Sequence, residues 1–332
     1  MICMASDRTH ISEHARSTGL APDGIRLVVT VPTFRRPDHL IATLASLEAQ
    51  HRGHDTAVIV MDNDAEGLEG ANAAAGWFET SKLQGIVIVA HQRGNCHAYN
   101  AGWETALAEF PNFAHIAVID DDEIAGPGWI AGLVETAQRC GADLVGGPQV
   151  PVFADRALDR WRRHPVFTPH YTQTGTVPIL YSSGNVLIAR RVLDAMPRPF
   201  LDPGFNFIGG GDSDFYRRAK ARGFTFGWCA EAEVMETLPA RRAEFSWLNA
   251  RSLRNGAISA IIEKRQRPGF SGRARTLAKS LALLAASPLR GIGLGLETKS
   301  AVIGLYHSQV ALGRLMAEFG LVNEQYRNPE SN

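Results

Sequence analysis

The stretch VIDDDEIAGPGW, residues 118–129, places three aspartates and a glutamate directly behind an apolar, β-branched run. One carboxylate at such a position can cap a helix or a turn. Several adjacent carboxylates repel one another unless a positive charge lies among them. The stretch therefore predicts a buried strand that ends at a site for a positive partner.

The composition of the whole chain limits what that partner can be. The chain has 332 residues, of which 45% are hydrophobic and 20% charged, as in ordinary water-soluble proteins of one large or two smaller domains. Lysine plus arginine and aspartate plus glutamate both number 34. Because neither sign is in excess, the composition does not favour nucleic acid or an anionic membrane as a partner of the whole chain, and any charged partner must bind locally.

The cysteines and the N-terminal segment indicate a cytoplasmic protein. No two cysteines form a C-x-x-C pair, and they are far apart in the sequence: Cys3, Cys96, Cys140 and Cys229. We therefore expect reduced thiols rather than a zinc site or a disulfide framework. Residues 1–24 lack the apolar segment of a secretory signal, and we expect them to form a poorly ordered tail.

Strand patterns alternate with helix patterns along the next part of the chain. Apolar, β-branched runs typical of buried strands occupy residues 25–34, 57–64, 85–90 and 114–120. Helical spacing of apolar residues follows the first, third and fourth of them. Strands that are apolar throughout and alternate with helices predict an α/β fold, with a mostly parallel sheet flanked by helices, over residues 25–240.

Three polar loops follow these strands, at residues 32–38, 62–64 and 120–123. In open parallel sheets, ligands bind outside the carboxyl ends of the strands, so we expect these loops to meet at one crevice. The first loop offers Thr33 and two arginines, and the third offers hard oxygen ligands. Mg²⁺ or Mn²⁺, held by one or two carboxylates and by substrate phosphates, is the usual positive partner of such a mixture. The alternative is that Asp62 and Asp122 only cap helices or turns.

A dinucleotide-binding domain is excluded by the turn after the first strand. That turn reads PTFRRP, residues 32–37, and contains none of the glycines that allow backbone to approach a pyrophosphate. The glycine-rich run GGGDSD, residues 209–214, ends in carboxylates that would repel a phosphate.

Six segments in a fixed order carry a resemblance to a known family. They are VPTFRRPDHLIATLASL, VIVMDND, GNCHAYNAG, VIDDDEIAGPGWI, SSGNVLIARRVL and GGGDSDFYRRAKARG. In this order they resemble family 2 glycosyltransferases of the GT-A fold, most of all the succinoglycan-type bacterial enzymes that build exopolysaccharide or lipopolysaccharide. The resemblance covers about residues 25–260. It implies a GT-A fold, Rossmann-like, with the remaining residues 241–332 as a C-terminal helical extension.

The resemblance implies the following donor site. Asp62 falls where the family's aspartate binds the nucleotide base, and Asp120 falls near the ribose. Asp122 is the implied metal ligand, with Glu236 as a second candidate, and Asp121 would face away along the chain. The residues expected to contact the nucleotide sugar are Pro32, Thr33, Arg35, Asp62, Asn100, Asp120 and Asp121.

The resemblance also implies an acceptor site and a catalytic base. Asp212 falls on the aspartate that serves as the base, although it could instead be the N-cap of the helix that begins there. Contacts to the acceptor are expected from Ser183, Gly184, Asn185, Gly211 and Asp214. Arg242 and Arg251 resemble the basic residues that can meet the diphosphate.

Three positions depart from the family pattern. The family's Glu-Asp pair reads Gly211-Asp212, and its Ala-Arg-Asn reads Ala98-Tyr99-Asn100, so a carboxylate and a phosphate-facing arginine are missing. Where many relatives have a late histidine near the metal, Glu236 is the plausible substitute. These changes leave open an alternative, a catalytically silent homologue that binds polysaccharide or acts as a scaffold.

The C-terminal region, residues 241–332, has a helical pattern throughout. Its segment from about residue 276 is apolar but broken, and the longest stretch without a charge, between Lys279 and Arg290, has ten residues and contains Pro288. A membrane-spanning helix needs about 20. We expect one or two amphipathic helices that lie on a membrane surface, with a helical lid or a dimer interface as the alternative.

The resemblance and the residues together predict an inverting, metal-dependent hexosyltransferase. A single displacement needs one base, and the sequence offers one good candidate, whereas a double displacement also needs a nucleophilic carboxylate. The expected cofactor is Mn²⁺ or Mg²⁺, and the expected donor is a nucleotide sugar, above all a UDP-sugar. The expected acceptor is a saccharide or lipid-linked saccharide in bacterial surface polysaccharide synthesis. We expect the protein in the cytoplasm at the inner face of the plasma membrane, with peripheral membrane contact and no nucleic acid as a partner.

Overall fold

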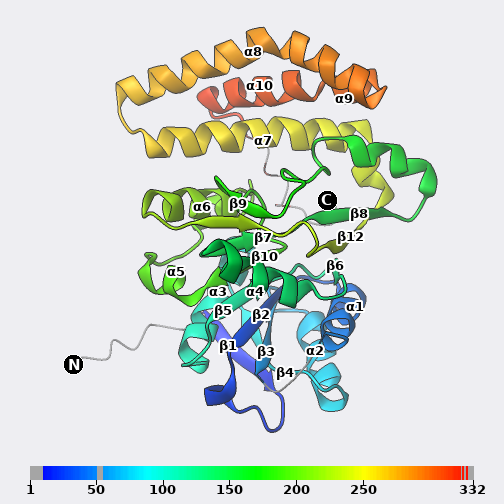
Figure 1. The fold of residues 1–332 in the computed structure, drawn as a ribbon, viewed down its shortest axis with the longest axis vertical. Coiled ribbons are helices and arrows are strands. Elements are labelled where there is room, and N and C mark those ends of the chain that lie inside the picture. The colour runs from blue at the N-terminus through cyan, green and yellow to red at the C-terminus, as the bar shows by residue number, and fades with distance from the viewer. Residues whose placement is uncertain (1–9, 51–54, 323, 325–326, 328–332) are drawn as a thin grey trace. The chain divides into compact units, whose positions relative to one another are not determined.

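The chain divides into two compact units in the computed structural model, which describes residues 10–50, 55–322, 324 and 327 (Figure 1). Unit 1 comprises the chain up to Gln149 together with residues 171–206 and 211–236, and unit 2 comprises residues 150–170, 207–210 and 237 onward. The sequence pattern predicted one domain over residues 25–240. By contact, residues 150–170 and 207–210 group with unit 2, whose last segment begins at residue 237.

Residues 150–170 belong to unit 2 because aromatic side chains of this segment are buried there. Phe153 and Phe167 are buried there in a cluster with Leu238, Ala243 and Leu248. Their rings meet edge to face, with centroids 5.6 Å apart. Aromatic residues of this kind dominate the energy of a small core, so the segment belongs to the unit that buries them.

Unit 1 is built on a nine-stranded mixed sheet. In spatial order its strands are β1 (Ile11–Arg16), β4 (Gln84–Ala90), β3 (Thr56–Asp62), β2 (Leu27–Thr33), β5 (His115–Val118), β10 (Val186–Ala189), β7 (Leu144–Gly146), β11 (Phe226–Trp228) and β9 (Gly175–Val177). Strands β4, β3, β2 and β5 are parallel neighbours, as the alternating pattern predicted. Beyond them β10 is antiparallel to both β5 and β7, so the parallel arrangement is confined to part of the sheet.

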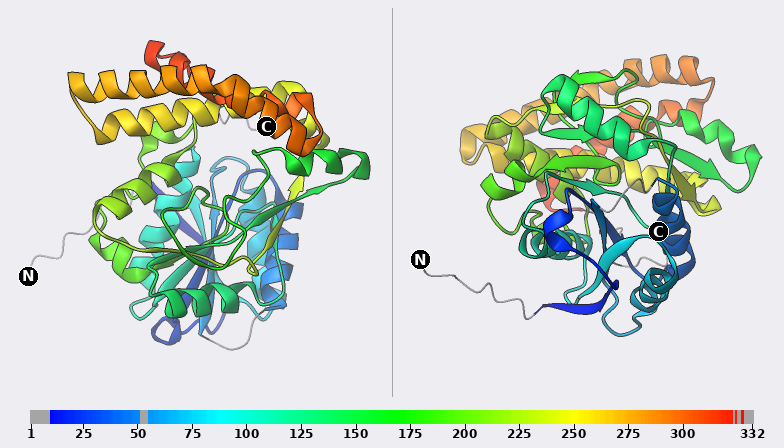
Figure 2. Two further views of the ribbon diagram at one scale, coloured as in Figure 1. Left: turned by 45° about the horizontal axis from the view of Figure 1, so that its top comes forward. Right: turned by 60° about the horizontal axis from the view of Figure 1, so that its bottom comes forward.

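Helices cover both faces of this sheet, as the left view of Figure 2 shows. Alternate residues of β2, such as Val29 and Val31, pack with one group of helices. That group is α1 (Pro37–Glu48), α2 (Glu69–Thr80) and α4 (Trp129–Cys140). The other face is covered by α3 (Asn95–Glu109), whose Gly102 lies against Met61 of β3. Burial of each such aliphatic side chain contributes about 1.5–3 kcal/mol.

The prediction of a disordered tail over residues 1–24 is wrong for residues 10–24, while residues 1–9 lie outside the described part of the chain. Strand β1 pairs antiparallel with β4, and the 3₁₀ turn η1 (Pro22–Gly24) follows it. β1 has the sequence ISEHAR and is mostly exposed. Its hydrogen bonds are made by backbone, so its polar side chains give little hydrophobic signal.

A second, three-stranded sheet has the order β6 (Glu123–Ala125), β12 (Val234–Leu238) and β8 (Gln149–Phe153). In the antiparallel pair of β6 and β12, Glu236 is the register partner of Glu123. Strands β8 and β12 are the points at which the chain passes from unit 1 into unit 2. The short helices of the remaining segments are α5 (Arg190–Ala195), α6 (Gly211–Ala221), η2 (Arg156–Arg163), η3 (Pro203–Phe205), η4 (Ala240–Ala243) and η5 (Ala317–Phe319).

The C-terminal part of unit 2 is helical, as predicted. Its helices are α7 (Phe245–Gln266), α8 (Phe270–Thr298), α9 (Ala301–Gly304) and α10 (Tyr306–Met316). α8 continues through Pro288, where the sequence suggested a break. Proline cannot donate to the carbonyl four residues earlier, and the hydroxyl of Ser287 donates to that carbonyl, Leu284 O, at 2.8 Å instead. Among the described residues, α8 is the helix long and apolar enough to cross a membrane by length and composition.

Candidate active site

The acidic stretch lies at the carboxyl end of β5, where the sequence placed it. Asp120 accepts a hydrogen bond from the phenol of Tyr99, which is on α3 and fully buried. The backbone N–H of Asp120 donates to Glu123 Oε2 at 2.9 Å, and the side-chain amide of Gln149 donates to Glu123 Oε1. Glu123 is also fully buried. The stretch is thus a fixed polar network and not a solvated loop.

The loop after β2 meets this network. Thr33 Oγ1 donates to Asp121 Oδ2 at 2.8 Å. Arg36 Nη1 lies 2.9 Å from Asp122 Oδ2 and 3.6 Å from Asp121 Oδ1. The expectation that Asp121 faces away was therefore wrong, because Thr33 and Arg36 draw its carboxylate toward the first loop. Arg35, in contrast, pairs with Asp64 at 2.7 Å.

The electrostatics of the cluster favour an additional cation. Burial, followed by repulsion from Asp122, raises the pKa of Asp120 and that of Asp121 to about 7. Burial, Asp120 and Glu236 together raise the pKa of Glu123 well above its ordinary value. Raised carboxyl pKa values show that the ionised forms are incompletely balanced by Arg36.

A divalent metal suits these carboxylate oxygens, because Mg²⁺ and Mn²⁺ prefer hard oxygen ligands. Within the described residues, no group of three or more histidine, cysteine, aspartate or glutamate side chains is arranged to hold a metal ion by itself. The residues present therefore fit a metal that takes one or two ligands from the protein and the rest from substrate phosphates and water. The side chain of Asp122 is 11% exposed, so it keeps some access to solvent, and Asp120 is also only partly buried.

The segment around Gly184 lies directly against the cluster. A Cβ atom at Gly184 would be 2.6 Å from Glu123 Oε1 and 2.9 Å from Asp120 Oδ2. Only glycine allows the backbone to come so close. The Ser182 hydroxyl donates a hydrogen bond to the side-chain oxygen of Gln149, and Ser183 is hydrogen-bonded to Tyr99. The segment therefore belongs to the same network.

Asn185, expected at the acceptor, has a structural role instead. Its Oδ1 accepts from Trp129 Nε1 at 2.7 Å, and its Nδ2 donates to the carbonyls of Pro148 and Ala232. The residue is 2% exposed, so its amide is used inside unit 1.

Asp62 accepts hydrogen bonds from two backbone N–H groups, one of them in the first turn of α2. Its Oδ2 accepts from the backbone N–H of Ala71 in the first turn of α2 at 2.7 Å, and its Oδ1 accepts from that of Asp64 at 2.9 Å. The carboxylate is fully buried, which raises its pKa. These two hydrogen bonds therefore fix the conformation of the loop that follows β3.

Asp212 and Asp214 lie in the first turn of α6 and have different surroundings. Asp214, predicted at the acceptor, is buried and paired with Arg218 at 2.7 Å. Asp212 is partly buried and accepts from the N–H of Ser213 at 2.7 Å. The pKa of the buried Tyr216 phenol is raised by burial and then by both Asp212 and Asp120. The expected base and the expected donor aspartate thus both raise the pKa of the same phenol, which itself donates to the Ser182 carbonyl.

Comparisons with known proteins agree with this geometry. The family model described as glycosyl transferase family 2 matches residues 28–195. The succinoglycan biosynthesis protein ExoM of Rhizobium meliloti is 32% identical over 243 residues, which are 70% of this chain and 73% of that protein. The chain belongs to glycosyl transferase family 2. It is a glycosyltransferase, and its similarity to ExoM supports a function in polysaccharide biosynthesis.

Solved structures confirm the GT-A fold of this glycosyltransferase. A mannosyltransferase of Pyrobaculum calidifontis, solved with GDP-Man and Mn²⁺, superposes with a TM-score of 0.57 at 17% identity and covers 90% of both chains. Residues 1–349 of Staphylococcus aureus TarS, solved with UDP, superpose with a TM-score of 0.51 at 11% identity over 89% of this chain and 91% of that one.

The structure gives the surroundings of three further residues predicted at the glycosyltransferase site. Asn100 makes two 2.8 Å hydrogen bonds with the backbone of Leu201, so its amide joins α3 to a distant loop. Arg242 and Arg251 belong to unit 2, where both guanidinium groups lie within 6 Å of the Trp247 ring centroid, at 5.7 and 5.9 Å.

Sequence reasoning missed four residues of the network: Tyr99, Arg36, Glu123 and Gln149. Arg36 and Glu123 lie in the polar loops identified from the sequence, but no role was predicted for either. Tyr99 was considered only as the replacement of an arginine in the family pattern. Gln149 gave no local signal, because its contact with Glu123 joins β8 to β6, which are far apart in the sequence and have β12 between them in the sheet.

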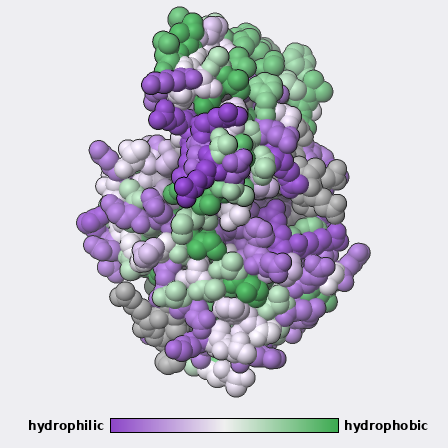
Figure 3. All heavy atoms as spheres, turned by 90° about the vertical axis from the view of Figure 1, so that its right-hand side faces the viewer, coloured by the Kyte–Doolittle hydropathy of each residue, from purple (hydrophilic) through white to green (hydrophobic). Residues whose placement is uncertain are grey.

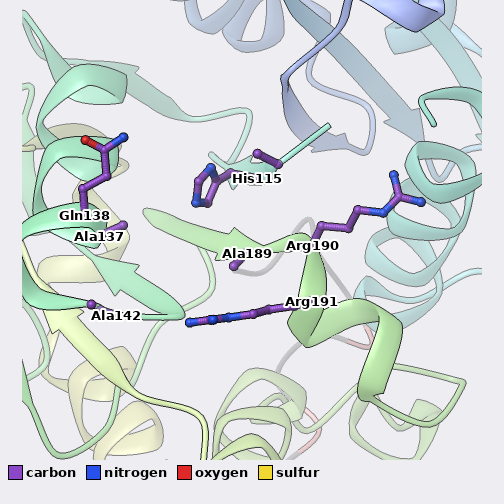
Figure 4. A pocket seen from close by; sticks show the side chains of 9 residues that line it. His115, Ala137, Gln138, Ala142, Ala189, Arg190 and Arg191 are labelled. Carbon is purple, nitrogen blue, oxygen red and sulfur yellow. The ribbon is translucent and has the colours of Figure 1, made fainter. Parts of the chain in front are cut away.

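A separate pocket of about 370 Å³ lies at the other end of β5. His115, Arg190 and Arg191 line it, as Figure 4 shows. His115 begins β5, whereas Asp120 follows its carboxyl end. Arg191 is paired with Asp143, and Arg190 donates to the carbonyls of Phe110 and Pro111, so these cations are committed to protein partners. The pocket takes no part in the donor site.

Proposed function

We propose that this glycosyltransferase is inverting and metal-dependent, and that it moves a hexosyl group from a nucleotide sugar to a saccharide acceptor carried on a lipid. The observation that carries the proposal is the acidic network of Asp120, Asp121, Asp122 and Glu123, in which Arg36 is the contacting cation. A nucleoside diphosphate with a divalent metal supplies the missing positive charge and the phosphate ligands together.

In this proposal, Asp122 holds Mn²⁺ or Mg²⁺, and Asp120 accepts a hydrogen bond from the ribose. When bound, the metal would neutralise charge on the diphosphate leaving group. Thr33, with the adjoining Pro32, and Arg36 fix the first loop against the nucleotide, and Asp62 shapes the second loop. Gly184 allows the backbone of its segment to approach the donor sugar, with Ser183 beside it.

Asp212 is the proposed general base. It removes the proton of the acceptor hydroxyl as that oxygen attacks the anomeric carbon from the face opposite the diphosphate. One displacement inverts the anomeric centre, because no covalent intermediate restores it. The salt bridge of Asp214 with Arg218 fixes the helix turn that carries Asp212, and Gly211 lies against Cys96, where a side chain would not fit.

The remaining parts of the proposal concern metal, nucleotide and location. The structural neighbours solved with GDP-Man and Mn²⁺ and with UDP support a nucleotide sugar and a divalent metal, and a UDP-sugar is the donor we propose. Glu236, beside Glu123 in the sheet, is the second candidate metal ligand, and Arg242 and Arg251 are candidate diphosphate contacts. We place the reaction in the cytoplasm, at the inner face of the plasma membrane.

The test is a panel of UDP-, GDP- and dTDP-sugars, scored for release of nucleoside diphosphate in the presence and absence of Mn²⁺. Slow hydrolysis needs no acceptor, so the panel can be run before the acceptor is known. Release from one donor, and only with a divalent metal, supports the proposal. A protein that binds these nucleotides without cleaving any of them, even with oligosaccharide acceptors added, would instead be a silent homologue.

A further inference from the structure

Helix α8 exposes its large apolar side chains and buries small and polar ones. Large apolar side chains are exposed along one side of it, in steps of three, four and seven residues, with one step of five across Pro288. They are Phe270, Leu277, Leu281, Leu284, Leu289, Ile292 and Leu296, and we call them the α8 face. Leu296 is 75% exposed and Leu289 78%. Figure 3 shows hydrophobic residues gathered over the C-terminal helices of unit 2.

The opposite side of α8 is buried, and it is made of small and polar residues. Thr276, Ser280 and Ser287 are at most 2% exposed, and Gly272 and Gly291 are buried with them. Gly291 lies so close to α9 that an added Cβ would be 2.5 Å from the Gly304 carbonyl oxygen. A helix of a water-soluble domain buries its leucines and exposes its hydroxyls, which is the reverse of this arrangement.

The interior beneath α8 is strongly polar. Arg314 of α10 is 1% exposed and donates to Ser280 of α8 at 3.1 Å, and its Nη2 lies 2.7 Å from Glu263 Oε2 of α7. These bonds anchor α8 through its hydroxyl side. Moving α8 across a bilayer would take the Ser280 hydroxyl away from Arg314 and place the buried hydroxyl groups of α8 in hydrocarbon, which is costly. α8 is thus fixed on unit 2 with its apolar side outward.

The charges on α8 indicate what covers the face. Its basic residues are Arg273, Arg275, Lys279 and Arg290, and Glu297 is its one acidic residue. All five are exposed. Lys279 is paired with Glu263 of α7, so the three arginines against Glu297 leave α8 with an excess of exposed positive charge. An anionic phospholipid surface offers both apolar chains for the leucines and negative headgroups for the cations.

We propose that the α8 face binds the surface of an anionic phospholipid bilayer, with α8 parallel to the membrane plane and its leucines at the boundary of headgroups and acyl chains. This deepens the proposed location of the enzyme at a membrane, and it rests on that proposal only for its biological purpose. The binding itself follows from α8 and requires no donor or acceptor.

The test is sedimentation of the full-length protein with vesicles, without nucleotide sugar. We expect binding to mixed phosphatidylcholine and phosphatidylglycerol vesicles, and much weaker binding to phosphatidylcholine alone. The double variant Leu281→Ser/Leu296→Ser should bind about 100-fold more weakly, because each leucine leaves the acyl boundary. The matched control, Val152→Ser/Phe245→Ser, removes exposed apolar residues outside the α8 face and should bind as the wild type does.

A second variant separates charge from apolar contact. Arg273→Glu/Arg275→Glu should lose the preference for phosphatidylglycerol. Unchanged binding by the leucine variant, equal binding to both kinds of vesicle, or a wild type that binds no vesicles and dimerises through the α8 face would each overturn the proposal. An enzyme that turns over a donor but ignores vesicles overturns this inference alone, whereas one that binds vesicles but cleaves no donor counts only against the proposed function.

Discussion

The phenol of Tyr99 donates to the carboxylate of Asp120, and this bond links α3 to the carboxyl end of β5. The relatives suggested by the sequence have an arginine at the position of Tyr99. A tyrosine cannot supply that charge, but it can hold Asp120 in one orientation. The bond also lowers the pKa of Asp120, against the larger effect of burial.

Tyr99→Phe should therefore weaken donor binding more than it slows the chemical step. Removing a hydrogen bond to a charged group costs about 1.5–3 kcal/mol, which is about 10- to 100-fold in affinity. We expect KM for the donor to rise by that factor while kcat falls less. The same deletion at Tyr171, whose phenol donates to the Ile179 carbonyl, is the control and should leave KM unchanged. A normal KM in Tyr99→Phe would show that the bond does not position Asp120 for the donor.

Asp212→Asn should abolish proton removal and keep the fold. Asparagine can still accept the hydrogen bond of Ser213, but it cannot take up a proton. We expect turnover to fall about 10²- to 10⁴-fold, with donor affinity and melting temperature nearly unchanged. Kinetics with a working donor and acceptor measure this.

The control for Asp212→Asn is Asp214→Asn in the same helix turn. That change breaks the buried pair with Arg218, so it should lower the melting temperature. A mutant of Asp212 that keeps more than about a tenth of wild-type turnover is incompatible with general-base catalysis of this size by that residue.

Metal binding should strengthen as the pH rises through neutrality. The pKa values of Asp120 and Asp121 are raised to about 7 in the fold, from an ordinary value of 3.8. The folded protein thus holds protons that the unfolded chain has lost. These groups favour folding below pH 4, and that contribution is lost as the pH rises to about 7.

Because a metal competes with those protons, the melting-temperature increase given by Mn²⁺ with a nucleoside diphosphate should be larger at about pH 8 than at about pH 6. Calorimetric scans at both pH values measure it. Asp120→Asn removes one of the titrating groups and should flatten the dependence. An increase in melting temperature that is the same at both pH values would contradict the electrostatic account of the cluster.

Local pattern was enough to predict the core of unit 1. The runs that form β2, β3, β4 and β5 are apolar at most of their buried positions, and the loops that follow β2, β3 and β5 carry most of the polar residues. Parallel strands bring such loops to one edge, so the meeting of Thr33 with Asp121 could be anticipated in general terms.

Details that depend on backbone conformation or on distant segments could not be predicted. Arg35 has φ of 55°, in the left-handed region, which separates its side chain from that of Arg36. One arginine therefore reaches Asp64 and the other reaches Asp122. Asn100 is hydrogen-bonded to the backbone of Leu201, 101 positions away, and no local sequence pattern predicts that contact.

The central claim is that Asp122 holds a divalent metal together with the diphosphate of the donor. Asp122→Ala tests it most directly by isothermal titration of nucleoside diphosphate with and without Mn²⁺. The residue lies at a strand end outside the core, so the variant should fold. The control is Asp194→Ala, which removes an exposed carboxylate on α5 that is paired with Arg190. The account predicts Mn²⁺-dependent binding in the wild type and in Asp194→Ala, and its loss in Asp122→Ala. Mn²⁺-dependent binding that is undiminished in Asp122→Ala would contradict it.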